Sequence, residues 1–181
     1  MKKSITTTFV VVCLIFTSSL SAQKFSSLDK SPLDAASYPS SYKISDKLAK
    51  VTYSRPQLKG RSVSELAPAG EVWRTGANEA VEISFYKNVS FGGADVKAGT
   101  YSLFSIPGEK EWTIILNKNL NQWGAYTYDE AADNVRVKAN PTTDKASLEE
   151  FSMTFNDTAV GPELVIGWGT VRVAVPVTES K

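Results

Sequence analysis

The sequence contains no histidine, and its single cysteine, Cys13, lies near the N-terminus. Histidine is the side chain that most often acts as a general base near neutral pH, so its absence excludes the commonest acid–base chemistry. Imidazole and thiolate are also the usual protein ligands of zinc, copper and haem iron. We therefore predict no cofactor, and no tightly bound zinc, copper or iron.

The first 22 residues have the layout of a secretory signal peptide. Lys2 and Lys3 precede an apolar run over residues 5–16, and small or polar residues continue to Ala22. The run is shorter than the roughly 20 residues of a membrane-spanning helix. We predict export to the periplasm or the extracellular space, with cleavage after Ala22, or after Ser21. No membrane span and no cysteine would remain.

Cleavage after residue 22 leaves 159 of the 181 residues, enough for one domain with a real core. It removes two of the 20 basic residues and none of the 19 acidic ones, so the net charge falls from +1 to −1. A chain without a basic excess is a poor nucleic-acid binder, and we predict no nucleic-acid partner. Oligomeric state is left open.

The pattern along the chain predicts an irregular leader over residues 23–46 and a single β domain over 47–181. Residues 62–66 could form one helical turn, and 92–95 read as a hairpin turn. Gly169-Thr170 predicts a further tight turn, within a closing hairpin over 163–177. Strands are predicted from alternating apolar residues and turn signals in segments 51–53, 81–86, 100–106, 112–116, 135–137, 151–155, 164–168 and 171–177.

These segments amount to roughly eight or nine short strands, and no long helix interrupts them. Such spacing favours an all-β fold over alternating strands and helices. We predict an antiparallel β-sandwich (jelly-roll-like) or a partly open barrel, two architectures that this pattern does not separate.

The most distinctive stretch is Trp-Arg-Thr-Gly-Ala-Asn-Glu at residues 73–79. Arg-Pro at 55–56 and Gly-Arg at 60–61 precede it, and Ala-Gly-Thr-Tyr at 98–101 follows, then Trp112 and Asn117. Over roughly residues 45–177 the chain resembles the exported-protein family catalogued as domain of unknown function 2911. Ala69 departs from the aromatic residue expected there. The resemblance implies export and a β-rich domain, and supplies no reaction, substrate or cofactor.

Polar and aromatic residues in and around this stretch form a hypothetical ligand site. An arginine offers a planar fork for anionic groups, asparagine and glutamate bind hydroxyls, and an exposed tryptophan offers a stacking face. Binding of a small polar, anionic or saccharide ligand, without catalysis, is the leading hypothesis. Its candidate residues are Arg55, Arg74, Asn78, Glu79, Asn117 and Trp123.

A structural interpretation of the same residues stays open, as an envelope or interaction domain without a small ligand. In it Trp73 is core, Arg74 pairs with Glu79 or Glu82, and Gly76 and Asn78 take positive-φ turn positions. Arg55 is then a loop arginine, and Asn117 caps or turns a strand.

A third alternative is a hydrolase that uses carboxylates and needs no histidine, with Glu79 and Glu82 as candidates. The acidic residues between 129 and 134 do not have the spacing of a calcium-binding loop, which favours a solvated acidic turn.

Overall fold

A computed structural model describes residues 23–180, so the predicted signal peptide lies outside the described residues. The described chain forms ten strands, one short helix, α1 (Val63–Leu66), and one 3-10 turn, η1 (Glu130–Ala132). The strands are β1 (Leu33–Tyr38), β2 (Ala49–Ser54), β3 (Val81–Phe85), β4 (Val89–Phe91), β5 (Ala94–Val96), β6 (Gly99–Ile106), β7 (Trp112–Asn117), β8 (Asp133–Ala139), β9 (Thr142–Thr158) and β10 (Gly161–Glu179).

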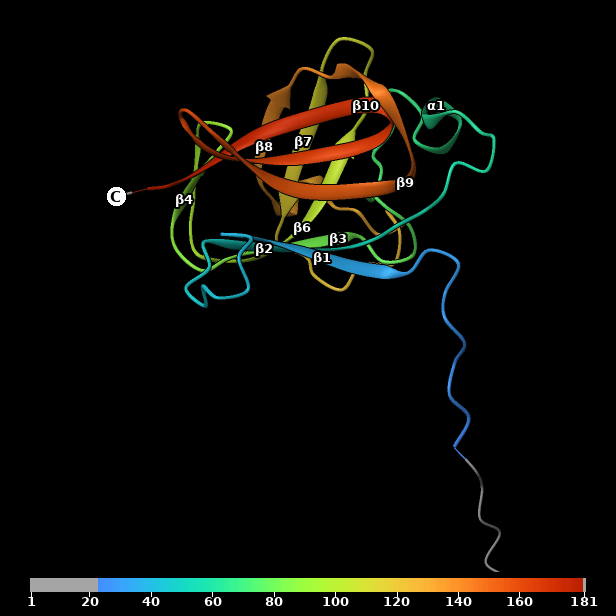
Figure 1. The fold of residues 1–181 in the computed structure, drawn as a ribbon, viewed down its shortest axis with the longest axis horizontal. Helices are drawn as coiled ribbons and strands as arrows, with labels where there is room; N and C mark the ends of the chain where they lie inside the picture. The colour runs from blue at the N-terminus through green and yellow to red at the C-terminus, as the bar shows by residue number, and fades with distance from the viewer. Residues whose placement is uncertain (1–22, 181) are drawn as a thin grey trace, which may run out of the picture.

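The strands form two antiparallel sheets that pack face to face (Figure 1). The larger has the order β1-β2-β3-β6-β7-β8, and the smaller has the order β5-β4-β10-β9. The sheets do not close into a barrel, which confirms the all-β class and decides in favour of the sandwich. No helix in residues 23–180 is long and apolar enough to cross a membrane.

Period-two alternation places one face of each strand between the sheets. In β3, Val81, Ile83 and Phe85 are buried while the residues between them are partly exposed. Both sheets contribute large side chains to this core, and an aromatic group lies at its centre. The Trp73 ring stacks on Trp168 with centroids 5.7 Å apart.

The predicted hairpin at residues 169–170 is wrong, because β10 runs unbroken through both residues. Its buried residues change parity, from Leu164, Ile166 and Trp168 to Val173, Val175 and Val177. A change of parity would turn the second half outward unless one residue is taken up on the way. The β9–β10 register shifts on both sides of Gly169, whose φ is +53°, so a bulge takes the place of the expected turn.

The expectation of an irregular leader fails for residues 33–38, which form β1 and pair with β2. Residues 23–32 contain no helix or strand; Asp29 and Pro32 contact the sandwich, and the segment before them runs away from it (Figure 1). The predicted helical turn at 62–66 and hairpin turn near 92–95 both occur, as α1 and the β4–β5 connection.

A second, smaller apolar cluster covers the outer face of the larger sheet. Ala80, Phe104 and Ile115 form it, and Ala125 and Tyr128 pack against it. Phe104 and Ile115 have neighbours in the main core, so β6 and β7 are buried on both faces. The loop over residues 118–132 is thereby held against the sheet.

Candidate functional site

The 73–79 motif leaves the core and crosses to the outer face of the larger sheet. Trp73 exchanges backbone hydrogen bonds with Ser105, at 2.8 and 2.9 Å, and extends the sheet beside β6. The fully buried Thr75 hydroxyl lies 2.9 Å from the Ser105 hydroxyl. The first half of the motif is therefore fixed to the core and the sheet.

Two residues of the motif have positive φ, Thr75 at +58° and Asn78 at +59°. The prediction is confirmed for Asn78 and wrong for Gly76, because Thr75 takes the left-handed conformation instead. Gly76 meets a different constraint, since a Cβ there would lie 3.3 Å from the Ser54 carbonyl oxygen. Glycine allows the loop to lie directly on β2.

The second half of the motif pairs with the 118–132 loop. Glu79 and Trp123 form a short antiparallel bridge. The Gly124 N–H donates to the Asn78 carbonyl at 2.9 Å, and the Ala80 N–H donates to the Gln122 carbonyl at 2.8 Å. Residues 42 to 46 positions apart in the sequence therefore form one rim.

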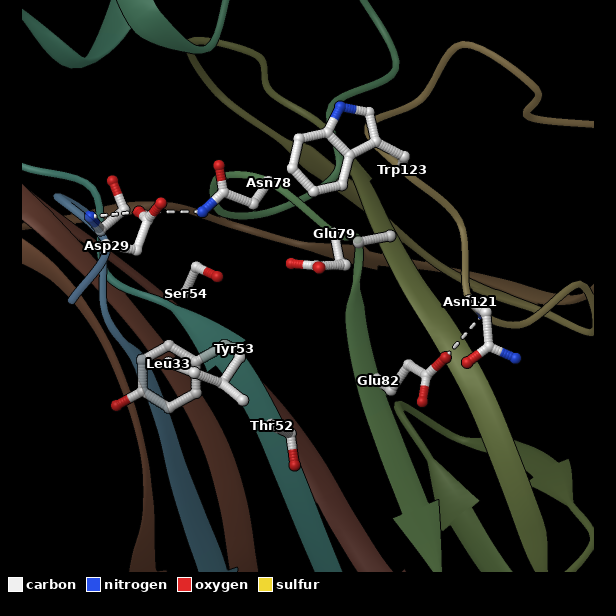
Figure 2. A pocket seen from close by; sticks show the side chains of 12 residues that line it. Asp29, Leu33, Thr52, Tyr53, Ser54, Asn78, Glu79, Glu82, Asn121 and Trp123 are labelled. Carbon is white, nitrogen blue, oxygen red and sulfur yellow. Dashed lines mark hydrogen bonds between the residues drawn. The ribbon is translucent and has the colours of Figure 1, made fainter. Parts of the chain in front are cut away.

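This rim borders a groove of about 750 Å³ on the outer face, which we call the outer groove. Residues 29–33 form one wall, β2 and β3 form the floor, and the rim carrying Asn78, Glu79 and Trp123 forms the other wall (Figure 2). Trp123 is unusually exposed for so large a side chain, with a relative exposure of 60%. Large exposed aromatic residues beside a groove are typical of binding surfaces.

Some polar groups of the outer groove already have protein partners. Asp29 accepts hydrogen bonds from the Ser31 N–H at 2.7 Å and the Asn78 amide at 3.0 Å. These two bonds, the backbone bond first, hold the pKa of Asp29 below its usual value. Glu82 accepts from the Asn121 N–H at 2.8 Å.

Other polar groups of the outer groove are free of such partners. Within residues 23–180, neither the Glu79 carboxylate nor the Ser54 hydroxyl makes a hydrogen bond or ion pair. Ser54 is only 3% exposed, yet it lines the groove. Figure 2 shows its hydroxyl and the Glu79 carboxylate directed toward one another across the floor. These groups are available to a ligand.

Of the six candidate residues, the structure brings together Asn78, Glu79 and Trp123 in the outer groove. Arg55 lies outside its lining and joins β1 to β9. Its guanidinium donates to Asp34 at 3.0 Å, to the Ser152 hydroxyl at 2.8 Å and to the Phe151 carbonyl at 3.2 Å. That set of partners ties the two sheets together.

Arg74 also lies outside the groove lining, and it is half-buried. The structural interpretation expected an ion pair with Glu79 or Glu82, and neither carboxylate lies within 4 Å of its guanidinium. Its Nε is buried and has no hydrogen-bond partner within the described residues. Arg74 therefore does not hold the fold through a carboxylate.

Asn117 is buried and has a full set of partners. Its amide donates to the Asp129 carbonyl at 2.9 Å and to Asp133 at 2.7 Å, and its oxygen accepts from the Asn119 N–H at 2.9 Å. The strand-end interpretation describes these contacts, which anchor the 118–132 loop.

The acidic residues between 129 and 134 belong to that same anchor. The Tyr128 hydroxyl donates to Asp133 at 2.6 Å, and Arg136 contacts both groups. Burial, followed by the bond to Asp133, raises the pKa of Tyr128 to about 12. Within residues 23–180 no three metal-ligating side chains come together.

Sequence reasoning missed Asp29, Ser54 and Asn121 as groove residues. No local signal marks them, since each is a common polar residue in a leader, a strand end or a loop. They meet only because β1 pairs with β2 and the 118–132 loop folds back over the sheet.

The comparisons with known proteins give one match. A family model described as "Protein of unknown function (DUF2911)" matches residues 31–177, which include β1 and nearly all of the sandwich. No curated protein and no solved structure matches the chain. The match therefore supplies no ligand or reaction.

Proposed function

Because the chain belongs to the DUF2911 family of proteins of unknown function, we propose its function from its own geometry: the outer groove binds a saccharide without changing it. The observation that supports this is an exposed tryptophan, Trp123, beside a groove whose Glu79 carboxylate and Ser54 hydroxyl have no partners among residues 23–180. A flat apolar ring next to a few convergent hydrogen-bonding groups suits a sugar ring, which has an apolar face and a rim of hydroxyls.

The charges of the groove favour a saccharide over an anion. Asp29, Glu79 and Glu82 line it, and no lysine or arginine of residues 23–180 does. The arginine fork that an anion would need is engaged elsewhere in the case of Arg55. The anionic part of the original hypothesis thus has no support from the groove.

The hydrolase alternative has one supporting observation, because Glu79 and Glu82 line the same groove. A glycosidase needs one carboxyl group to protonate the leaving oxygen and a second to act as base or nucleophile. Glu82 is held by the Asn121 N–H, and Glu79 is exposed on the rim. Loss of the bound saccharide over time, with release of a shorter product, would favour hydrolysis over simple binding.

The test is a glycan array probed with residues 23–181, followed by calorimetric titration of any saccharide that binds. Trp123→Ala should weaken binding by about 1–2 kcal/mol, roughly five- to thirtyfold, because the stacking face is lost. Tyr86→Ala is the matched control, since Tyr86 is 55% exposed and lies outside the groove lining. Equal affinities for the wild type and Trp123→Ala would contradict the proposal.

The proposal places this binding outside the cytoplasm, on the strength of the order of residues 1–22. Mass spectrometry of the protein recovered from the exported fraction should find an N-terminus at or near Gln23. A retained Met1 in that fraction would exclude cleavage.

A further inference from the structure

The negative charge of the outer groove affects which saccharides, neutral, acidic or basic, it can bind. Three carboxylates line it, and the nearest basic residue in the sequence, Lys30 beside Asp29, is not part of the lining. Asp29 and Glu82 are occupied by protein N–H groups, whereas Glu79 has no partner within the described residues. All three carboxylates keep their negative charge, and Glu79 is the one among them without a hydrogen-bond partner in residues 23–180.

A second, independent feature lies on the floor. Ser54 is almost completely buried, its hydroxyl has no partner among residues 23–180, and its side chain lines the groove (Figure 2). The hydroxyl itself is open to the groove, because it is not among the fully buried polar atoms, and a groove-facing hydroxyl that the protein leaves unpartnered is available to a ligand group. The sugar hydroxyl that fits here can donate or accept, because serine does both.

Trp123 adds a third contact of the same kind. The face of an indole ring carries negative charge density and attracts an ammonium group that lies over it. Glu79 and Trp123 are bridged to each other on the rim, so both can act on one substituent of a sugar stacked there.

From these contacts we propose that the outer groove selects amino sugars, saccharides whose free amine is protonated, over neutral and acidic ones. This inference rests on the proposed saccharide binding and names its substrate class. The ammonium pairs with Glu79, a hydroxyl of the same or the next ring pairs with Ser54, and the ring stacks on Trp123. Uronic acids are disfavoured, because their carboxylate would face three like charges.

The experiment uses calorimetry at mildly acidic pH to compare the affinities of three β-1,4-linked tetrasaccharides. One is built of glucosamine, one of N-acetylglucosamine and one of glucose. The glucosamine oligomer should bind about two- to fivefold more tightly than the other two, the range for an exposed ion pair. The advantage should be present in about 0.02 M sodium chloride and lost in about 1 M sodium chloride, where the Debye length is roughly 3 Å.

Glu79→Gln should remove the advantage, so that the glucosamine oligomer and its N-acetylated counterpart bind with equal affinity. Glu71→Gln is the matched control, since Glu71 is also exposed and does not line the groove. Both changes are isosteric and on the surface, and thermal melts should superimpose on the wild type.

Two contrary results are distinguishable. Tighter binding of the N-acetylated or glucose oligomer, or an advantage that survives in Glu79→Gln, overturns the amino-sugar inference and leaves saccharide binding intact. Failure of all three to bind, together with a negative glycan array, overturns both.

Discussion

The two halves of the 73–79 motif have opposite surroundings. Trp73 is 7% exposed and contacts Trp112, Trp168 and Phe151, and Thr75 is hydrogen-bonded inside the protein. Four residues after Thr75, Glu79 is exposed on the rim of a groove and has no partner in the part of the chain that the structure describes. The first half is satisfied by the fold, and the second half leaves hydrogen-bonding capacity unused.

The contrast shows how a single distinctive string can carry two roles. Polar groups that the fold engages, such as Arg55 with three hydrogen bonds and Asn117 with three, stabilise the sandwich and lie outside the groove lining. Polar groups without partners, such as Glu79 and Ser54, gather at one place. Whether a polar side chain has hydrogen-bond partners in the protein therefore distinguishes structural residues from candidate binding residues better than the residue type does.

Trp73→Ala should have the largest effect on stability. The substitution removes a ring that stacks on Trp168 and meets Trp112 and Phe151 edge-on, and it leaves a cavity between the sheets. We expect a loss of about 3–5 kcal/mol in the free energy of unfolding, measured by urea denaturation. A loss below about 1 kcal/mol would mean that the first half of the motif does not anchor the core.

Arg55→Ala should cost about 1–2 kcal/mol, because three hydrogen bonds, two of them to β9 of the other sheet, are lost from a side chain that is 34% exposed. Arg61→Ala serves as the control. Arg61 is exposed and contacts only the Leu58 and Gln57 carbonyls of its own loop, so we expect a change within about 0.5 kcal/mol. Equal melting temperatures for the two variants would mean that the Arg55 side chain does not stabilise the sandwich.

Tyr128 makes a pH-dependent contribution of about 1 kcal/mol or less to the free energy of unfolding. Its folded pKa of about 12 exceeds the value of 10.0 for a free tyrosine, so its contribution is complete below pH 10 and is lost as the pH rises toward 12. Hydrogen bonding to Asp157 also raises the pKa of Tyr38, and burial raises that of Tyr53, so several groups should ionise above pH 10 in a tyrosinate absorbance titration. Tyr128→Phe should remove the component near pH 12. Ionisation of Tyr128 near pH 10 would mean that the 118–132 loop is open to water.

Arg74→Ala should have the smallest effect on stability, under about 1 kcal/mol. Arg74 makes no ion pair with Glu79 or Glu82, so its removal leaves no buried carboxylate unpaired. A loss of 3 kcal/mol or more in thermal or urea melts would restore the structural interpretation of this residue.

The alternating residues of β3 and the short segments between turns were enough to predict the all-β class, because one-sided burial leaves a period-two pattern, but they did not separate a sandwich from a barrel. The bulge at Gly169 was mistaken for a turn, since both begin with a positive-φ glycine. Trp123 and Glu79 were recognisable as candidates by residue type. Ser54 and Asp29 were not, because the pairing of distant strands alone brings them to the groove.

The most direct test of saccharide binding at the outer groove uses the four tryptophans of the chain as reporters. Trp73, Trp112 and Trp168 are buried in the core, and Trp123 alone lines the groove. In a proton–nitrogen NMR titration with the glucosamine tetrasaccharide, we expect the Trp123 indole signal to shift in a saturable way while the other three stay in place. Saturable binding that leaves the Trp123 signal unmoved would contradict the assignment of the site.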